Sequence, residues 1–266
     1  MVQRSRATNS GDNVMGNNTD TFRKRLADGD QLVGTFLKTP SPIVAEVLSL
    51  SNLDLFCIDA EHAPFGRLEV DHCVGAFRAA DRPSLVRIAN DSPTEIRNAL
   101  DSGATGILVP HVTSAEQAAA IVKAAHFGEG GRGFAGSSRA ADYTTKPMAD
   151  HIADSRERTT IVVQIEDIAA LEHVAQIAAV HGVDALFVGR FDLAVAMQKS
   201  PSDAEVIATV RDICAAGQSA GTAVGMFTSN LDEIPDWREA GASLFLLSSD
   251  QSMILAGANA LAQAIR

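Results

Sequence analysis

The feature of this 266-residue sequence that most limits its fold is a repeated alternation of short apolar runs with segments of helical periodicity. The runs have the length and residue types of buried strands, and helical spacing of apolar residues follows each of them. The predicted strands are Leu32–Leu37, Leu53–Asp59, Ser84–Ile88, Gly106–Val109, Thr160–Glu166, Ala185–Val188, Ala223–Phe227 and Leu244–Leu247. The predicted helices are Ile43–Leu50, Glu69–Ala80, Thr94–Leu100, Ala115–Ala125, Ala169–Ala178, Glu205–Ala220, Ile234–Ala240 and Ile254–Ile265. This alternation is typical of an α/β protein with a parallel sheet.

The number of strand and helix pairs distinguishes between the two common parallel architectures. Eight pairs fit a closed (β/α)8 TIM barrel better than an open doubly wound sheet, because such a barrel has eight units in roughly 250 residues. We therefore predict a single barrel domain over residues 19–266. Residues 1–18 are rich in Asn, Ser, Gly and Arg and have little to bury, so we expect a flexible extension there.

Charge and composition narrow the range of partners. The chain has 22 Lys and Arg residues against 33 Asp and Glu, a formal net charge of −11. Nucleic-acid binding normally needs a basic surface, so we predict no nucleic-acid partner. No apolar run reaches the roughly 20 residues of a membrane helix, which predicts no membrane partner. Cys57, Cys73 and Cys214 lack the spacing of a zinc site or a disulfide framework, and we expect a cytoplasmic protein.

The catalytic residues of such a barrel lie where the strands end, so polar residues at these ends are the candidates for chemistry. Gln164 and Glu166 close the fifth predicted strand, and Gly189–Asp192 follows the sixth. Adjacent strands would direct Glu166 and Asp192 at one point, and two carboxylates there suit Mg²⁺ or Mn²⁺ with positions open for water and substrate. The alternative is that Asp192 caps the next helix and Glu166 pairs with a nearby arginine.

Two further candidates stand at the ends of the second and third predicted strands. His62 follows Asp59 and Glu61, and an imidazole held by a carboxylate can act as a general base near neutral pH. Arg87 ends an otherwise apolar strand, where a cation is costly unless it is paired or meets an anion. The alternative role of Arg87 is a structural salt bridge to Asp59, Glu61 or Asp101.

Two weaker signals concern covalent chemistry and anion binding. Lys38 ends the first strand, where an amine can form a Schiff base with a carbonyl substrate. Because Lys38 adjoins a Thr-Pro turn, a solvated residue at the rim is the favoured interpretation. The connection from about residue 127 to 159 is glycine-rich and holds Arg132 and Arg139. A connection of this length is usually functional, although glycine and arginine are also common in plain turns.

Taken together, a series of motifs resembles the HpcH/HpaI family of class II, metal-dependent pyruvate aldolases, typified by 4-hydroxy-2-oxoheptanedioate aldolase. The motifs are Ile58–Pro64 (IDAEHAP), Arg87, Leu100–Ala104 (LDSGA), Val109–Val112 (VPHV), Arg132-Gly133, Arg139-Ala140, Gln164–Glu166 (QIE) and Gly189–Leu193 (GRFDL). They occur in order from about residue 20 to the end of the chain. The resemblance implies a barrel of the phosphoenolpyruvate/pyruvate-binding type, often a hexamer made as a trimer of dimers that exchange their C-terminal helices.

The resemblance also implies an activity and its ligands. Enzymes of this kind cleave a 4-hydroxy-2-oxo acid to pyruvate and an aldehyde through a metal-stabilised pyruvate enolate. Glu166 and Asp192 match the ligands of the divalent cation, which is Mg²⁺, Mn²⁺ or Co²⁺. Gln164 and Asp192 match residues beside the substrate, and the backbone amide of Phe191 matches the group that receives the pyruvate carboxylate.

Three residues match catalytic positions of the family. His62 matches the base, Asp101 the carboxylate that raises its basicity, and Arg87 the cation that stabilises the enolate. In cleavage, the base takes the proton from the 4-hydroxyl group as the carbon–carbon bond breaks.

The sequence departs from the usual family pattern at three positions near the predicted mouth. Arg190 stands where Pro is common, Phe191 where a small residue is frequent, and Lys38 where an uncharged residue is usual. Arg190 and Lys38 would favour an acidic aldehyde. The alternative functions are a citrate-lyase-type or acyl-CoA carbon–carbon lyase on the same barrel, or a non-catalytic barrel that binds an oxo acid.

Overall fold

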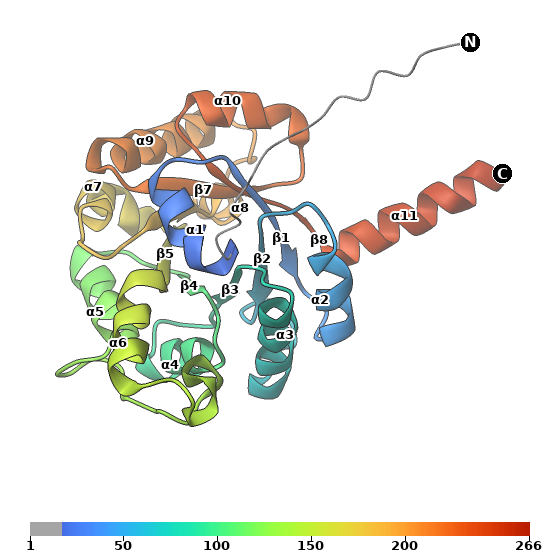
Figure 1. Ribbon diagram of the computed structural model, residues 1–266. Coiled ribbons are helices and arrows are strands. Elements are labelled where there is room, and N and C mark those ends of the chain that lie inside the picture. Colours follow the sequence, from blue (N-terminus) through green and yellow to red (C-terminus); the bar gives the residue numbers. More distant parts are fainter. Residues whose placement is uncertain (1–17) are drawn as a thin grey trace, which may run out of the picture.

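The computed structural model describes residues 18–266 of the chain. Eight parallel strands pair in sequence order, and β8 pairs with β1 to close the barrel (Figure 1). The strands are β1 (Leu32–Leu37), β2 (Leu55–Asp59), β3 (Ser84–Arg87), β4 (Gly106–Val109), β5 (Thr160–Ile165), β6 (Ala185–Val188), β7 (Ala223–Thr228) and β8 (Leu244–Ser249). The prediction of a (β/α)8 barrel is confirmed.

Helices surround this barrel (Figure 1). The α-helices are α1 (Asn18–Ala27), α2 (Pro42–Ser49), α3 (Arg67–Ala79), α4 (Pro93–Asp101), α5 (Ala115–Ala125), α6 (Met148–Arg158), α7 (Val174–Ala178), α8 (Arg190–Ala196), α9 (Ala204–Ala220), α10 (Ile234–Glu239) and α11 (Asp250–Ile265). Three short 3₁₀ helices are η1 (Arg139–Thr144), η2 (Ile168–His173) and η3 (Leu231–Glu233). The predicted helix 169–178 is divided between η2 and α7. The predicted long connection contains η1 and α6 and is therefore largely structured.

The interior of the barrel is closed at one end by the first helix. Phe22 and Leu26 of α1 are buried in the same hydrophobic cluster as Leu32 and Leu244, which begin β1 and β8. The burial of these apolar side chains stabilises α1 against the amino-terminal ends of the strands. A second cluster lies between the strands and the surrounding helices. The fold thus leaves the carboxyl-terminal ends of the strands for chemistry, as in other barrels of this type.

Local sequence signals determine where the helices near the carboxyl-terminal ends of the strands begin. Ser41, Ser92 and Ser114 each accept a hydrogen bond from the backbone N–H three residues ahead, at the starts of α2, α4 and α5. Pro42 and Pro93 occupy the first helical positions. These caps satisfy backbone donors that have no partner within the helix, so each helix begins directly after its strand and loop.

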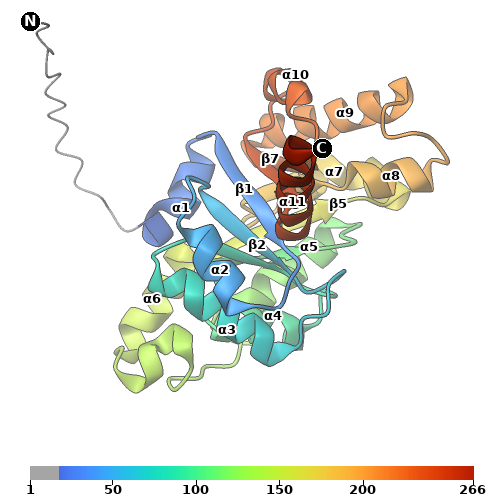
Figure 2. The ribbon, with the colours of Figure 1, turned by 90° about the vertical axis from the view of Figure 1, so that its right-hand side faces the viewer.

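The last helix, α11, leaves the barrel and projects into solvent (Figures 1 and 2). Its start is fixed because the buried Asp250 accepts hydrogen bonds from the backbone N–H groups of Lys38 (2.6 Å) and Thr39 (3.1 Å). Residues 251–266 are exposed. Ile254, Ala258, Leu261 and Ile265 recur at helical spacing, which makes an apolar stripe on this exposed helix.

The extension predicted over residues 1–18 lies outside the described residues, apart from Asn18, at which α1 begins. From residue 18 to residue 266, no helix combines the length and the apolar character needed to span a membrane.

Candidate active site

A cavity of about 310 Å³ opens at the carboxyl-terminal ends of the strands. Aromatic side chains form part of its wall: Phe36, Phe187, Phe191 and Phe227. Polar residues from β1, β3, β5 and β8 and from the start of α8 also line it: Lys38, Arg87, Gln164, Arg190, Asp192, Ser248, Ser249 and Ser252. Of the candidates that the sequence placed near strand ends, the cavity is lined by Lys38, Arg87, Gln164, Arg190 and Asp192, whereas His62 and Glu166 are not among its lining residues.

The guanidinium group of Arg87 is held by two carboxylates. Its Nε and Nη2 atoms lie 3.0 and 2.8 Å from the two oxygens of the fully buried Asp59, and Nε lies 3.3 Å from Oε2 of Glu61. Burial raises the pKa of Asp59, but the hydrogen bonds and charge of Arg87 outweigh it, and the net pKa is below its usual value. The salt-bridge alternative for Arg87 is thus realised with Asp59 and Glu61. It leaves Arg87 fixed in the wall of the cavity.

Lys38 joins the same ionic network. Its Nζ atom lies 3.2 Å from Oδ2 of Asp59, and its side chain is half-buried. The ion pair directs the amine of Lys38 at the buried carboxylate of Asp59. The arrangement favours a structural and electrostatic role for Lys38.

His62 lies at the rim of the site. Its backbone N–H donates to Oδ1 of Asp59 (3.1 Å), and this bond fixes the turn after β2. The imidazole Nε2 lies 3.6 Å from Oε2 of Glu61, and the side chain is 57% exposed. The ring is therefore exposed, with the carboxylate of Glu61 beside it.

The structure does not bring Asp101 to His62. Asp101 ends α4, and its Oδ1 accepts a hydrogen bond from Nε of Arg132 (3.1 Å). Because α4 runs back along the barrel, its last residue lies near the start of β4 rather than at the mouth. Within residues 18–266, no hydrogen bond or ion pair joins Asp101 to His62. The carboxylate beside His62 is that of Glu61.

Glu166 is the most buried carboxylate at the end of β5, with 4% of its surface exposed. Its Oε1 accepts a hydrogen bond from the backbone N–H of His111 (2.9 Å), and its Oε2 accepts one from the side-chain amide of Gln164. Burial raises the pKa of Glu166 against these hydrogen bonds, and the nearby charge of Asp192 raises it further. The charge of Asp192 therefore acts on Glu166, and a metal shared by the two carboxylates stays a prediction.

The alternatives for these two carboxylates find no support. Asp192 lies in the first turn of α8, but Gly189 is the capping residue and no side chain caps this helix. Among the described residues, Glu166 has no ion pair with an arginine; its ion-pair partner is His111. At Gly189, a Cβ atom would lie 2.6 Å from Cβ of Glu166, so only glycine allows α8 to start this close to Glu166.

A second group of potential metal ligands includes Glu166. One ligand atom each from Glu61, His111 and Glu166 lie within 4.8 Å of one another. His111 follows β4 with a left-handed backbone (φ 56°), and its Nδ1 is 3.3 Å from Glu166 and 3.0 Å from Asp167. Burial lowers the pKa of His111, but the hydrogen bond and charge of Asp167 and the charges of Glu166 and Glu61 raise it overall.

These residues fit a divalent cation. Within the described chain, Oε1 of Gln164 is buried and lacks a hydrogen-bond donor, and the partners of Oε2 of Glu61 are the ion-pair contacts with Arg87 and His62. Buried acceptor oxygens without donors are costly, and a hard cation satisfies such oxygens. From the sequence, Glu61 was expected only as a partner of His62 or Arg87, and His111 was not expected as a metal ligand. Both follow the ends of strands, which is the signal that selected the other candidates.

Arg190 is not a free cation at the mouth. Its Nη1 lies 2.8 Å from Oε2 of Glu233, and its guanidinium group is buried near the rings of Phe191 and Trp237. Because Lys38 is also paired, the expected preference for an acidic aldehyde has no unpaired cation to support it. The backbone N–H of Phe191 lies in the first turn of α8, where amides have no partner within the helix and can receive a carboxylate.

A closed parallel barrel with acidic, imidazole and guanidinium groups at the ends of its strands defines the protein as a (β/α)8-barrel enzyme. The chain belongs to the HpcH/HpaI aldolase/citrate lyase family, which matches residues 32–256. The resemblance seen in the sequence is confirmed, and the protein is a carbon–carbon lyase.

Three relatives illustrate the range of the family. A hydroxypyruvate/pyruvate aldolase from Roseovarius nubinhibens is 32% identical over 238 residues, which cover 89% of this chain and 93% of the relative. The crystal structure of an HpcH/HpaI aldolase/citrate lyase family protein from Burkholderia cenocepacia J2315 has a TM-score of 0.87 and 33% identity, covering 93% of this chain and 99% of that chain. The structure of a citrate synthase has a TM-score of 0.81 and 27% identity, covering 91% of this chain and 96% of that chain.

Proposed function

We propose that this enzyme is a class II aldolase that reversibly cleaves a 4-hydroxy-2-oxo acid to pyruvate and an aldehyde with a divalent cation. The observation that carries the proposal is the group of Glu61, His111 and Glu166, whose ligand atoms lie within 4.8 Å of one another beside Arg87. Family membership and the names of relatives that act as pyruvate aldolases support this choice.

The cation would be held by Glu166, with Asp192 as the family resemblance implies and with Glu61 and His111 within reach. When bound, a divalent cation supplies Lewis-acid stabilisation of negative charge on the keto oxygen of the substrate. Carboxylate oxygens suit Mg²⁺ and Mn²⁺, and a contribution from the imidazole of His111 would favour a transition metal such as Co²⁺ over Mg²⁺.

The chain itself contributes charge stabilisation and proton transfer. Arg87, held by Asp59, places a fixed guanidinium group where the enolate oxygen develops charge, so little reorganisation is needed. His62 takes the proton of the 4-hydroxyl group as the bond between C3 and C4 breaks, and the electron pair of that bond passes into the enolate of pyruvate. The neighbouring Glu61 stabilises the imidazolium ion that results. The amide of Phe191 binds the pyruvate carboxylate.

Treatment with a chelator is expected to abolish pyruvate release, and added Mg²⁺, Mn²⁺ or Co²⁺ is expected to restore it. The physical reason is that the carboxylates of Glu61 and Glu166 lie close together with the imidazole of His111, and a divalent cation bound there supplies the charge that stabilises the enolate. The measurement is pyruvate release from a panel of 4-hydroxy-2-oxo acids, before and after metal is returned. As a control, borohydride with pyruvate should leave no adduct on the protein. Activity that persists in chelator, with an adduct trapped on Lys38, would contradict the proposal.

The variant His62→Ala is expected to lose aldol cleavage while it retains metal and pyruvate binding. A positioned general base typically contributes a factor of roughly 10² to 10⁴ to the rate. Steady-state kinetics would give the loss in kcat, and calorimetry would give the affinity for Mn²⁺ and pyruvate. His72→Ala, at a solvent-exposed position on α3, serves as the matched control. Equal rates for the two variants would exclude His62 as the base.

The second candidate function is a carbon–carbon lyase reaction of the citrate-lyase type. The similarity of the chain to a citrate synthase supports it. The two activities differ in their products, because cleavage of citrate gives oxaloacetate and cleavage of a 4-hydroxy-2-oxo acid gives pyruvate. A coupled assay for each product with citrate and with the oxo-acid panel separates them. Membership in a family of lyases sets aside the non-catalytic alternative.

The exposed α11 supports an assembly in which subunits exchange this helix, and we place such an oligomer in the cytoplasm. Its apolar stripe, which includes Ile254 and Leu261, has no contact with its own barrel beyond the helix start. The double variant Ile254→Asp/Leu261→Asp is expected to reduce the oligomer to smaller species, because burial of two aspartates in an apolar contact is costly. Light scattering after size-exclusion chromatography measures the mass. Gln263→Asp, on the same helix, should leave the mass unchanged; an unchanged mass in the double variant would refute the exchange.

A further inference from the structure

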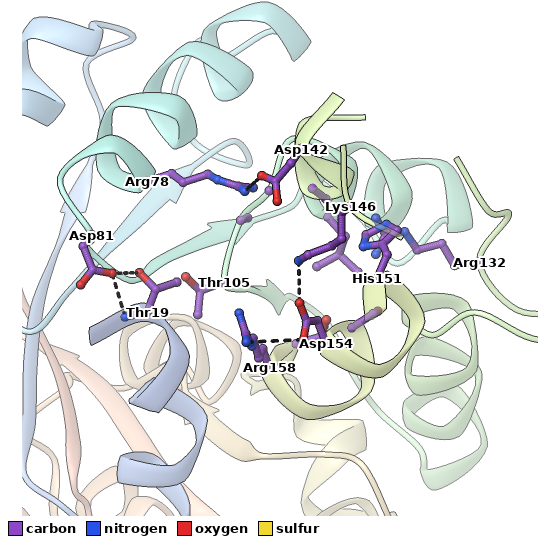
Figure 3. A pocket seen from close by; sticks show the side chains of 16 residues that line it. Thr19, Arg78, Asp81, Thr105, Arg132, Asp142, Lys146, His151, Asp154 and Arg158 are labelled. Carbon is purple, nitrogen blue, oxygen red and sulfur yellow. Dashed lines mark hydrogen bonds and ion pairs between the residues drawn. The ribbon is translucent and has the colours of Figure 1, made fainter. Parts of the chain in front are cut away.

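A second cavity, of about 520 Å³, lies at the other end of the barrel (Figure 3). Thr105 and Thr159, which directly precede β4 and β5, form part of its wall, and side chains from η1 and α6 form another part. Because these strands begin at this cavity and end at His111 and Glu166, the length of the barrel separates it from the active site. The cavity has no part in the chemistry proposed above.

Charged residues surround this cavity, and cations outnumber carboxylates. The cations are Arg78, Arg132, Lys146 and Arg158, and the carboxylates are Asp81, Asp142 and Asp154. Figure 3 shows that most of them are joined in ion pairs: Arg78 with Asp142, and both Lys146 (2.6 Å) and Arg158 (3.4 Å) with Asp154. Arg132 is paired with Asp101, which lies behind the cavity wall. Lys146 and Arg158 share the single carboxylate of Asp154, so this pair of cations carries more charge than the carboxylate between them.

Two buried polar groups of α6 line the cavity without hydrogen bonds. His151 and Ser155 are 3% and 8% exposed and lie four residues apart, on one face of the helix. Within the described residues, neither Nε2 of His151 nor Oγ of Ser155 has a hydrogen-bond partner. Burial of such groups costs free energy unless a partner is supplied. The ring of His151 packs against Phe127 and Phe134, with centroid distances of 5.0 and 5.8 Å, so it is held in place.

Cations lie close to the buried ring of His151. Burial is the main reason that the pKa of the imidazole is low, and the charges of Arg132 and Lys146 lower it further, whereas Asp101 and Asp154 act in the opposite direction. An anion beside the ring would offset the effect of these two cations and accept hydrogen bonds from the wall of the cavity.

We propose that this cavity binds a small oxyanion, the phosphate or carboxylate group of a metabolite, between Arg132, Lys146 and His151, with Ser155 as a further hydrogen-bond donor. Arg132 and Lys146 provide charge, and His151 and Ser155 provide the buried polar atoms that lack partners. A bound anion reverses the local field, so His151 takes up a proton on binding and donates from Nε2. The inference is independent of the proposed aldolase reaction.

The test is calorimetric titration of the metal-loaded enzyme with inorganic phosphate and, separately, with succinate, at constant ionic strength and with chloride as the reference anion. Saturating pyruvate is present to occupy the active site. We expect one site per chain, and the tighter of the two anions identifies the group that the cavity accepts. Enthalpies measured in buffers of different ionisation heat should show proton uptake.

The variants His151→Gln and Lys146→Gln are each expected to weaken binding by about tenfold or more, the value of one charge-assisted hydrogen bond. Proton uptake should disappear in His151→Gln, and Ser155→Ala should weaken binding without affecting proton uptake. Lys199→Gln, which removes one positive charge from an exposed ion pair elsewhere, is the matched control and should bind like the wild type. All four variants should release pyruvate at the wild-type rate without added anion, which shows that they fold.

Three results would overturn the proposal. The first is that neither anion binds more tightly than the chloride reference. The second is that the anion binds only when pyruvate is left out, which would place the binding in the active site. The third is that Lys199→Gln weakens binding as much as Lys146→Gln, which would mean that the anion responds to net charge only.

Discussion

Glu166→Gln is expected to abolish metal-dependent pyruvate release, with a fall in kcat/KM of at least about a hundredfold. The amide keeps the size of the side chain and can keep the hydrogen bond from the backbone N–H of His111, but it loses the negative charge that a divalent cation requires. The burial of Glu166 makes this charge hard to replace with solvent. The measurements are steady-state kinetics with Mn²⁺ and the dissociation constant of Mn²⁺ by calorimetry.

Asp167→Asn is the matched control for that experiment. Asp167 is the next carboxylate at the same rim, it is half-exposed, and it contacts His111 but not the buried amide of Gln164. Its loss should change Mn²⁺ affinity far less than the loss of Glu166. Wild-type Mn²⁺ affinity in Glu166→Gln would show that the cation binds elsewhere.

Arg87→Ala is expected to slow the exchange of the methyl protons of pyruvate with solvent deuterium by about 10² to 10³-fold. This exchange reports enolate formation without the aldehyde, so it isolates the step in which a cation faces the developing charge. Proton NMR of pyruvate in D₂O measures it directly. Exchange at the wild-type rate in a folded variant would refute the role of Arg87 in the enolate step.

The same substitution also affects stability, which has to be separated from catalysis. Removal of Arg87 leaves Asp59 without its main partner, and loss of one member of a buried ion pair costs about 3–5 kcal/mol. Arg87→Lys keeps the charge but loses the two-pronged contact with Asp59, so it should fold more stably and still exchange slowly. Thermal unfolding of both variants shows whether slow exchange accompanies a folded protein.

The positions of His62, Arg87, Gln164, Glu166 and Asp192 follow from a simple rule. Each residue stands where a predicted strand ends, and a parallel barrel brings all such ends to one rim. The rule depends only on the count and order of the strands, which the hydrophobic pattern of the sequence contains. For the same reason Lys38 was found at the rim, although its pairing with Asp59 could not be foreseen.

Asp101 lies outside this rule. The resemblance assigned it to the base, but it ends a helix rather than a strand, and helices in this fold run in the opposite direction to the strands. Its side chain is consequently bound to Arg132, away from His62. Glu61 occupies the position beside His62 instead, because the tight turn after β2 brings the two side chains together.

The sequence by itself determined the barrel, the rim at which chemistry occurs and the family, because these depend on periodicity and on motifs that are local in the chain. Only the tertiary structure decided which charges neutralise one another: Arg190 with Glu233, Arg87 with Asp59, and His111 with Glu166. The tertiary structure also decided that α11 leaves its own barrel. It likewise decided that His151 and Ser155 of α6, which lack side-chain hydrogen-bond partners, face a cavity. The physical reason is that ion pairing and the satisfaction of buried polar atoms depend on distances between residues far apart in the chain, about which a one-dimensional pattern carries no information.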